Sequence, residues 1–205
     1  MHTVPSYFAN LELELKRLFD VVLSVTGLVL SSPLWVVISV LIKASDGGPI
    51  FFVQERWGRE AVRIRVRKFR TMSHATPDTA RPAEHGDARI TPIGRVLRAA
   101  GLDELPQLLS ILSGDMSFVG PRALAVNERV IDQDGSERAY DEIPGFRERL
   151  RVRPGLTGWT TVYFPRDLPV REKFARDLEY IEMRSFLLDF RLFVSSLWIS
   201  VRGRW

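Results

Sequence analysis

A long apolar run near the N-terminus constrains this 205-residue sequence more than any other feature. From Leu18 to Ile42 the only charged residue is Asp20, and a helix of that length could cross the hydrocarbon core of a bilayer. A secretory signal peptide would have a shorter apolar region followed by a small-residue cleavage site, whereas here "KASDGGP" leads directly into the rest of the chain. The run therefore predicts a membrane-embedded segment over residues 1–45, followed by a globular domain over residues 46–205.

Ser32 and Pro33 interrupt this run near its middle. Proline removes a helical hydrogen bond and kinks or breaks the helix, and serine hydroxyls can bond the carbonyl groups that it frees. Cationic residues flank the run on both sides: Lys16 and Arg17 precede it, and Lys43, Arg56 and Arg59 follow it. Because cationic flanks prefer the cytoplasm, we expect a re-entrant helix–break–helix that enters and leaves on one side. A kinked signal anchor that spans the bilayer is the alternative.

Composition narrows the chemistry of the globular part. The net charge is +4, which indicates anionic partners such as phosphates, nucleic acid or an anionic membrane surface. No nucleic-acid-binding motif is recognisable, so nucleic acid is not expected as a partner. The chain has no cysteine, which excludes disulfides and cysteine-based metal sites, and its three histidines lie too far apart in sequence to form a local metal-ligand motif.

Two strands are predicted after the apolar run, over residues 50–54 ("IFFVQ") and 62–70 ("VRIRVRKFR"). Period-two alternation places Ile64 and Val66 inside and Arg63, Arg65 and Arg67 outside. The same parity turns Lys68 and Arg70 inward, where buried cations are costly unless they meet anions. We therefore expect a phosphate site at this end of the strand, with a bulge that turns both cations to solvent as the alternative.

The rest of the chain is predicted to be mainly helical. Residues 73–87 are polar and proline-rich and suggest a loop or lid, and residues 91–114 form two helices separated by Gly101. Residues 127–150 are highly charged and predict a surface helix and loop. Residues 186–205 mix large apolar side chains with arginine, as helices lying in a membrane interface do, and a core helix with an arginine face is the alternative. The expected fold class is α/β, mostly helical with a small irregular sheet.

Asp103 and Glu104 stand at the start of the second of these helices, directly before "LP". If Asp103 is the N-cap, Pro106 lies in the first turn, and the positive helix end attracts anions to the same place. Four cations could join them: Lys68, Arg70, Arg98 and Arg122. Such a group could hold a pyrophosphate with Mg²⁺ between phosphates and carboxylates, and one carboxylate could then attack phosphorus. The alternative is a simple N-cap with Glu104 solvated beside it.

Seven ordered motifs give these residues a family context. They are "KRLFD" at 16–20, "SP" at 32–33, "GGPIFFVQERWG" at 47–58, "KFRTM" at 68–72, "LDELPQL" at 102–108, "GDMSFVGPR" at 114–122 and "RPGLTGW" at 153–159. Together they strongly resemble the bacterial sugar transferase family, the monotopic polyprenyl-phosphate phosphoglycosyl transferases. The resemblance extends from about Lys16 to Ser196, and the length matches the minimal catalytic form.

The resemblance implies an enzyme that moves a sugar-1-phosphate from a UDP-sugar to undecaprenyl phosphate and releases UMP. Mg²⁺ would be required, and Asp103 would be the nucleophile that forms a covalent phosphosugar intermediate. Glu104 would help to place the metal or handle the proton of the acceptor. The reaction would be the first membrane step of glycoconjugate synthesis, at the cytoplasmic face of the bacterial inner membrane among its phospholipids.

The resemblance also assigns the surrounding residues. Lys68, Arg70 and Arg98 would hold phosphates or orient the acidic pair, and Arg122 would contact the nucleotide phosphate. Ser32 and Pro33 would form the break of the re-entrant helix. In two places the sequence departs from the family pattern. Ala123 replaces the second proline of Pro-Arg-Pro, which puts the nucleotide contact in question, and "REAV" lacks the usual second glycine after "RWG", which puts the local turn in question.

Two other functions are compatible with parts of the sequence. A nucleotide-sugar glycosyltransferase could use Asp132 and Asp134, a bare Asp-x-Asp in a polar loop, to hold a metal. A membrane-anchored module without catalytic activity could use its arginines on anionic lipid or nucleic acid, but this would leave the inward cations and the acidic pair unexplained. The sequence does not identify the sugar or the pathway, and it is compatible with a homo-oligomer.

Overall fold

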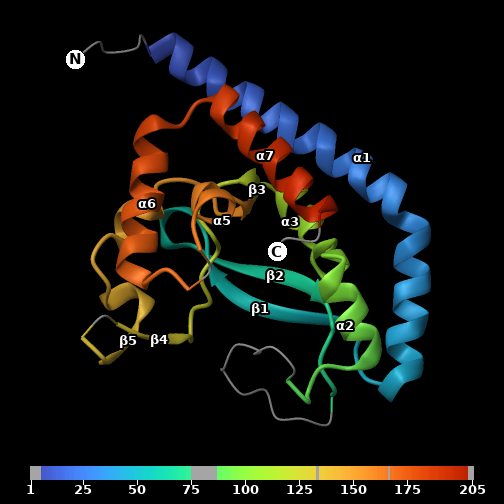
Figure 1. Ribbon diagram of the computed structural model, residues 1–205. Helices are drawn as coiled ribbons and strands as arrows, with labels where there is room; N and C mark the ends of the chain where they lie inside the picture. The colour runs from blue at the N-terminus through green and yellow to red at the C-terminus, as the bar shows by residue number, and fades with distance from the viewer. Residues whose placement is uncertain (1–5, 75–86, 133, 166, 203–205) are drawn as a thin grey trace.

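The computed structural model describes residues 6–74, 87–132, 134–165 and 167–202, so most of the predicted lid at residues 73–87 lies outside the described residues. Within these ranges the chain is mostly helical, as expected, but its strands form three separate two-stranded sheets in place of the one small irregular sheet that was expected (Figure 1). The elements in chain order are α1 (Ser6–Asp46), β1 (Phe51–Trp57), η1 (Arg59–Ala61), β2 (Arg63–Phe69), α2 (Pro92–Ala99), η2 (Leu102–Glu104), α3 (Gln107–Ser113), β3 (Ser117–Val119), β4 (Arg129–Ile131), β5 (Glu137–Ala139), η3 (Tyr140–Glu142), α4 (Phe146–Arg149), β6 (Gly155–Thr157), α5 (Trp159–Tyr163), α6 (Val170–Met183) and α7 (Phe186–Val201).

Helix α1 is continuous through Pro33, and Figure 1 shows that it changes direction in its second half. Proline has no N–H for the carbonyl four residues earlier, which is that of Val29. The hydroxyl of Ser32 donates to this same carbonyl at 2.8 Å, so the group freed by the proline is bonded again. The serine contact is as expected, but the helix break expected at Ser32 and Pro33 is not seen, because α1 continues through both residues as in the kinked alternative.

Polar residues of α1 fix its N-terminal half to β3. Lys16 Nζ donates to the Val119 carbonyl at 2.9 Å and forms an ion pair with Asp189 of α7. The buried carboxylate of Asp20 accepts from the backbone N–H of Phe118 at 3.0 Å. The "KRLFD" motif is thus a docking motif that joins the apolar helix to a central strand.

Further contacts run along the length of α1. Arg17 donates to the carbonyl groups of Ile111 and Leu112 at 2.7 Å each, which satisfies carbonyls at the C-terminal end of α3. At Gly27 the helix passes so close to α3 that an added Cβ would lie 3.0 Å from Leu108 Cδ1. The middle of α1 therefore lies against the globular body as its N-terminal half does.

The C-terminal half of α1 packs on a second part of the body. Ile38 and Ile42 are buried in one cluster with Phe69, and the Trp35 ring meets that of Phe69 edge-on at 5.3 Å. The opposite side of the helix is apolar and exposed. Its exposed residues include Leu18, Val22, Val25, Val29, Leu30, Val36, Val37 and Val40. By length and composition, Leu11–Asp46 could cross a membrane.

The β1–β2 hairpin follows the predicted alternation. Ile64 and Val66 are buried, whereas Arg63, Arg65 and Arg67 are exposed. Glu60 and Ala61 form the turn with positive φ angles of 57° and 60°, and the Val62 N–H donates to the Arg59 carbonyl at 3.1 Å. The turn that lacks the family glycine is thus made by two residues held in the left-handed region.

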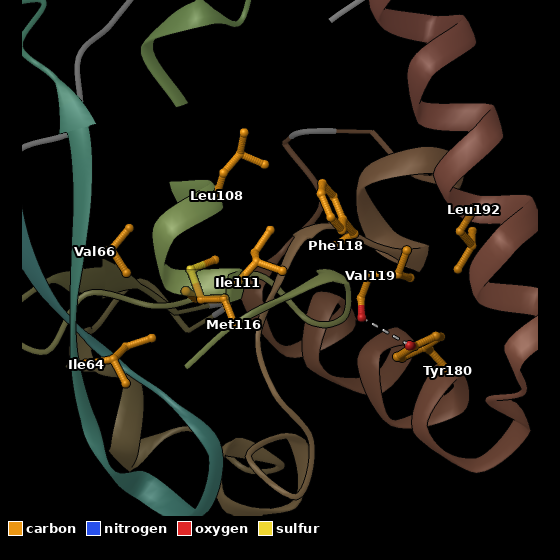
Figure 2. Packing of buried hydrophobic residues seen from close by; sticks show 10 residues of the cluster. Ile64, Val66, Leu108, Ile111, Met116, Phe118, Val119, Tyr180 and Leu192 are labelled. Atoms are coloured by element: carbon orange, nitrogen blue, oxygen red, sulfur yellow. Dashed lines mark hydrogen bonds between the residues drawn. The ribbon is translucent and has the colours of Figure 1, made fainter. Parts of the chain in front are cut away.

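The main core lies between this hairpin, α3 and α7, and Figure 2 shows its side chains. Within it, β3 pairs in parallel with β6. The two segments meet through glycines, because a Cβ added to Gly155 or Gly158 would lie 2.1 or 2.2 Å from backbone atoms of Gly120. The "GPR" and "RPGLTGW" motifs are therefore complementary backbone surfaces.

The C-terminal third differs in part from the predictions. Residues 127–150 were expected to form a helix and loop, but they contain the β4–β5 hairpin and two short helical segments, η3 and α4. The predicted terminal helix at residues 186–205 corresponds to α7, which covers Phe186–Val201. Leu192 of α7 is fully buried, whereas Leu187, Phe190, Val194, Leu197 and Trp198 are exposed. Helix α7 therefore has a core face and an exposed apolar face beside α1.

Candidate active site

The acidic pair lies in a short turn between α2 and α3. Gly101, with φ 66°, precedes η2, which carries Asp103 and Glu104. Helix α3 begins at Gln107, and its N-cap residue is Pro106, which has no side-chain capping bond. The prediction that Asp103 is the N-cap is therefore wrong, because the 3₁₀ turn separates the acid from the helix start.

Lys68 of β2 fixes the side chain of Glu104. Lys68 Nζ donates to Glu104 Oε1, and the two side chains are 20% and 32% exposed. Burial opposes ionisation of Glu104, but the charges of Lys68, Arg122 and Arg56 and the bond from Lys68 outweigh it and lower the pKa of Glu104. Glu104 is therefore an ionised carboxylate with one oxygen held by a lysine.

The pKa of Asp103 is shifted in the opposite direction from that of its neighbour Glu104. Burial raises the pKa of Asp103, and the negative charge of Glu104 raises it further, while Lys68 and Arg98 act in the opposite direction. In the described part of the chain, no cation forms an ion pair with the Asp103 carboxylate. Two adjacent acids thus have different environments: Glu104 is engaged by a lysine, whereas Asp103 is half-buried and, among the described residues, has no ion-pair partner.

Arg70 is turned inward, as the alternation predicts, but it contacts the end of α1. Its Nη1 donates to Asp46 Oδ2 at 2.5 Å, its Nη2 also bonds Asp46, and its Nε donates to the Pro49 carbonyl at 2.5 Å. The expectation that the inward cations meet anions is thus satisfied by two carboxylates, Glu104 for Lys68 and Asp46 for Arg70. The role of Arg70 in phosphate binding stays a prediction.

Three arginines act on the acidic pair from other elements. The charge of Arg98, on α2, favours ionisation of Asp103, and the charges of Arg122 and Arg56 favour ionisation of Glu104. The side chains of Arg98 and Arg122 are exposed. The structure thus brings together Lys68, Arg98 and Arg122 from the predicted set and adds Arg56.

Arg56 is the residue that the sequence interpretation missed as part of the site. It pairs with Ile64 in the hairpin register, and Ile64 is buried. Cross-strand partners share a face of the sheet, so the register could have indicated an inward arginine. Its Nη1 donates to the Ala123 carbonyl at 2.6 Å, and within the described residues its buried Nε has no hydrogen-bond partner.

The Asp-x-Asp pattern is engaged by arginines. Asp132 is buried and accepts from Arg171 Nε and Nη2 at 2.7 and 2.6 Å. Asp134 accepts from Arg138 Nη2 at 2.7 Å. The middle residue, 133, lies outside the described residues. Both carboxylates of this pattern are therefore neutralised by the protein itself, on the β4–β5 hairpin.

The residues that the structure describes contain no cluster of three or more His, Asp or Glu side chains suited to a metal ion. Mg²⁺, however, usually takes only one or two protein carboxylates and completes its shell with water and substrate phosphates. The available carboxylate of Asp103 and the ionised carboxylate of Glu104 fit that requirement. The pair is therefore a chemically suitable donor set for Mg²⁺ in the presence of a diphosphate.

Comparison with known proteins defines the class. Residues 11–203 match the family described as bacterial sugar transferase, and the chain belongs to this family. Among its relatives, the exopolysaccharide production protein PSS of Rhizobium leguminosarum bv. phaseoli is 38% identical over 190 residues, which cover 89% of this chain and 92% of that protein.

Two further relatives carry names that state an activity. The UDP-glucose:undecaprenyl-phosphate glucose-1-phosphate transferase of Caulobacter vibrioides is 39% identical over 184 residues, or 86% of this chain and 66% of that protein. The UDP-N-acetylgalactosamine-undecaprenyl-phosphate N-acetylgalactosaminephosphotransferase of Aeromonas hydrophila is 38% identical over 180 residues, or 85% of this chain and 41% of that protein. The chain thus spans nearly all of one relative and about two-fifths of another.

Proposed function

We propose that the protein is a membrane phosphoglycosyl transferase that moves a sugar-1-phosphate from a UDP-sugar to undecaprenyl phosphate and releases UMP. The observation that carries this proposal is the available, half-buried carboxylate of Asp103 beside the Lys68–Glu104 pair, with Arg98, Arg56 and Arg122 acting on the same two acids. Four cations around two carboxylates suit a substrate with two adjacent phosphates. The names of the relatives indicate the same substrate classes.

Asp103 acts as the nucleophile in this proposal. One of its carboxylate oxygens attacks the phosphorus next to the sugar, the bond from that phosphorus to the oxygen shared with UMP breaks, and the electron pair leaves with UMP. An oxygen of undecaprenyl phosphate then attacks the same phosphorus, and the bond to Asp103 breaks and restores the carboxylate. Burial of Asp103 removes water that would otherwise solvate and weaken it as a nucleophile.

The other charged residues stabilise phosphate oxygens. Lys68 holds Glu104 in one orientation, and Arg98 and Arg122, which are exposed, bind the phosphates of the incoming nucleotide. Asp103 and Glu104 would hold Mg²⁺, which neutralises charge on the diphosphate and so favours departure of UMP. Arg70, engaged by Asp46, keeps β2 and the end of α1 together beside this site.

We also propose that α1 is monotopic: it lies in one leaflet, and the site faces the cytoplasm. Support comes from the contacts of α1, because residues near its start, middle and end all touch the same globular body. A helix that crossed the bilayer would carry one end away from that body. Helices α1 and α7 lie side by side (Figure 1). Both carry exposed apolar side chains, which would enter the lipid together.

The reaction is tested by incubating the detergent-solubilised protein with UDP-sugars, undecaprenyl phosphate and Mg²⁺ and measuring UMP. We expect release that is lost in Asp103→Asn and kept in Asp115→Asn, a matched change at an exposed acid bonded to Ser113. Without acceptor, intact mass should show one sugar-phosphate added to the wild type and none to Asp103→Asn. Release of UDP in place of UMP, or unaltered activity of Asp103→Asn, would refute the proposal.

The topology is tested separately. Because the chain has no cysteine, single cysteines at Asn10 and Ser45 would be unique reporters. Re-entry predicts that neither is labelled by an impermeant reagent added to intact cells and that both are labelled after permeabilisation. Labelling of one position alone from outside would mean that α1 spans the membrane.

A further inference from the structure

Two arginine side chains bond the backbone that carries Arg122. Arg149 Nη2 donates to the carbonyl of Arg122 at 3.0 Å, and Arg56 Nη1 donates to the carbonyl of Ala123 at 2.6 Å. We infer that Arg149 and Arg56 are positioning residues: they fix this stretch of backbone and thereby direct the Arg122 side chain toward the nucleotide phosphates. The inference rests on the proposed function of Arg122.

Arg149 is held rigidly before it reaches Arg122. Its Nε and Nη2 donate to Asp177 Oδ2 at 3.0 and 2.6 Å, and the two side chains are 3% and 4% exposed. Thr160 Oγ1 donates to the other carboxylate oxygen of Asp177 at 3.0 Å, and the guanidinium lies over the Phe174 ring at 4.6 Å. A buried ion pair tolerates little displacement, because any loosening leaves a charge uncompensated.

The bond to Arg122 depends on the shape of the guanidinium group. The same Nη2 atom donates to both Asp177 and the Arg122 carbonyl, so one planar group joins α6 to the loop after β3. Lysine would keep the positive charge against Asp177, but its single compact ammonium is shorter and lacks the fork geometry. Arg149→Lys therefore keeps the positive charge beside Asp177 but removes the hydrogen bond to the Arg122 carbonyl.

Ala123 explains why such contacts matter in this chain. Where the family pattern has a second proline, Ala123 leaves the backbone torsion unrestricted by a ring. On the preceding side, the backbone is fixed by the Gly155 N–H, which donates to the Pro121 carbonyl at 2.9 Å. Arg149 and Arg56 supply the next two restraints along the chain, so the backbone on both sides of the Arg122 side chain is held without the second proline.

The test compares Arg149→Lys with Arg171→Lys in the full-length protein. Arg171 is a matched control because its Nε and Nη2 also bond a buried aspartate, Asp132. In steady-state UMP release, Arg149→Lys should raise the KM for the UDP-sugar about tenfold and leave the KM for undecaprenyl phosphate unchanged. Arg171→Lys should change neither value. A wild-type KM for the UDP-sugar in Arg149→Lys would overturn the inference.

A double-mutant cycle distinguishes positioning from general support of the fold. In an Arg122→Ala background, Arg149→Lys should have less than about a twofold further effect, because no guanidinium is left to direct. Multiplicative losses would overturn the inference.

A binding measurement needs no turnover. UDP should raise the melting temperature of the wild type and of Arg171→Lys, and it should raise the melting temperature of Arg149→Lys clearly less. If UDP stabilises all three proteins equally, or does not stabilise the wild type, the inference is overturned whether or not UMP is released. Absence of UMP release by the wild type would instead count against the proposed function.

Discussion

The turn between β1 and β2 holds an alanine in a conformation that glycine adopts without cost. Ala61 has φ 60° next to Glu60 with φ 57°, and the left-handed region costs a non-glycine residue roughly 1–2 kcal/mol. Replacing Ala61 by glycine removes this strain but gives the unfolded chain more freedom, which costs roughly 0.5–1 kcal/mol. We therefore expect Ala61→Gly to stabilise the protein by about 0.5–1 kcal/mol net.

The prediction can be checked by thermal unfolding in detergent. For a chain of this length, that gain corresponds to a rise in melting temperature of about 1–4 °C. Ala100→Gly is the matched control, since Ala100 is also exposed but has φ −93°, so only the entropic cost applies and the melting temperature should fall. Equal destabilisation by both substitutions would show that position 61 is not strained and would refute the reasoning.

Four further outcomes are expected. In metal-free buffer Asp103→Asn should raise the melting temperature at pH 7, because burial raises the pKa of Asp103 and so disfavours its ionised form. This gain in melting temperature should vanish as the pH falls below 3.8, the ordinary pKa of aspartate. A gain that does not depend on pH would contradict the prediction. Arg17→Met should lower the free energy of unfolding by about 2–4 kcal/mol, because two carbonyl groups of α3 lose a charged donor. Denaturant titration measures this free energy, and a decrease of less than about 0.5 kcal/mol would count against the prediction. Gly158→Ala should disrupt the β3–β6 contact, since its Cβ would lie 2.2 Å from the Gly120 carbonyl oxygen, and a normal melting curve would refute the close approach. EDTA should abolish UMP release and added Mg²⁺ should restore it, whereas release that persists in EDTA would exclude the metal requirement.

The sequence predicted what depends on local periodicity. Period-two alternation in residues 62–70 identified β2 and turned Lys68 and Arg70 inward, because the face of a strand residue follows from parity alone. The carboxylates that these cations meet lie far away in the sequence: Glu104 is 36 residues from Lys68, and Asp46 is 24 residues from Arg70. Periodicity carries no information about such distant contacts. The position of the acidic pair beside Lys68 was therefore inferable, but its pairing was not.

The errors have similar origins. An acid shortly before a proline is typical of an N-cap, but Gly101 in the left-handed region starts a 3₁₀ turn and moves the start of α3 to Gln107. Residues 127–150 are so rich in charge that their pattern hides short strands, and the turn at Gly135, with φ 80°, closes a hairpin there. Arg149 could not be assigned from sequence, because its contact with Arg122 exists only after α4 and α6 have packed.

The docking of α1 has a consequence for how the protein is made. Helix α1 is synthesised before the residues that hold it: Lys16 bonds residues 103 and 173 positions later, and Asp20 bonds one 98 positions later. At roughly 5–20 residues per second, these partners are synthesised about 5–35 s after α1. Throughout that interval a lysine and an aspartate must stay hydrated while the apolar side chains around them avoid water. With the topology proposed above, the interface of a membrane meets both demands, and the lipid surface would hold the nascent helix until its partners are made.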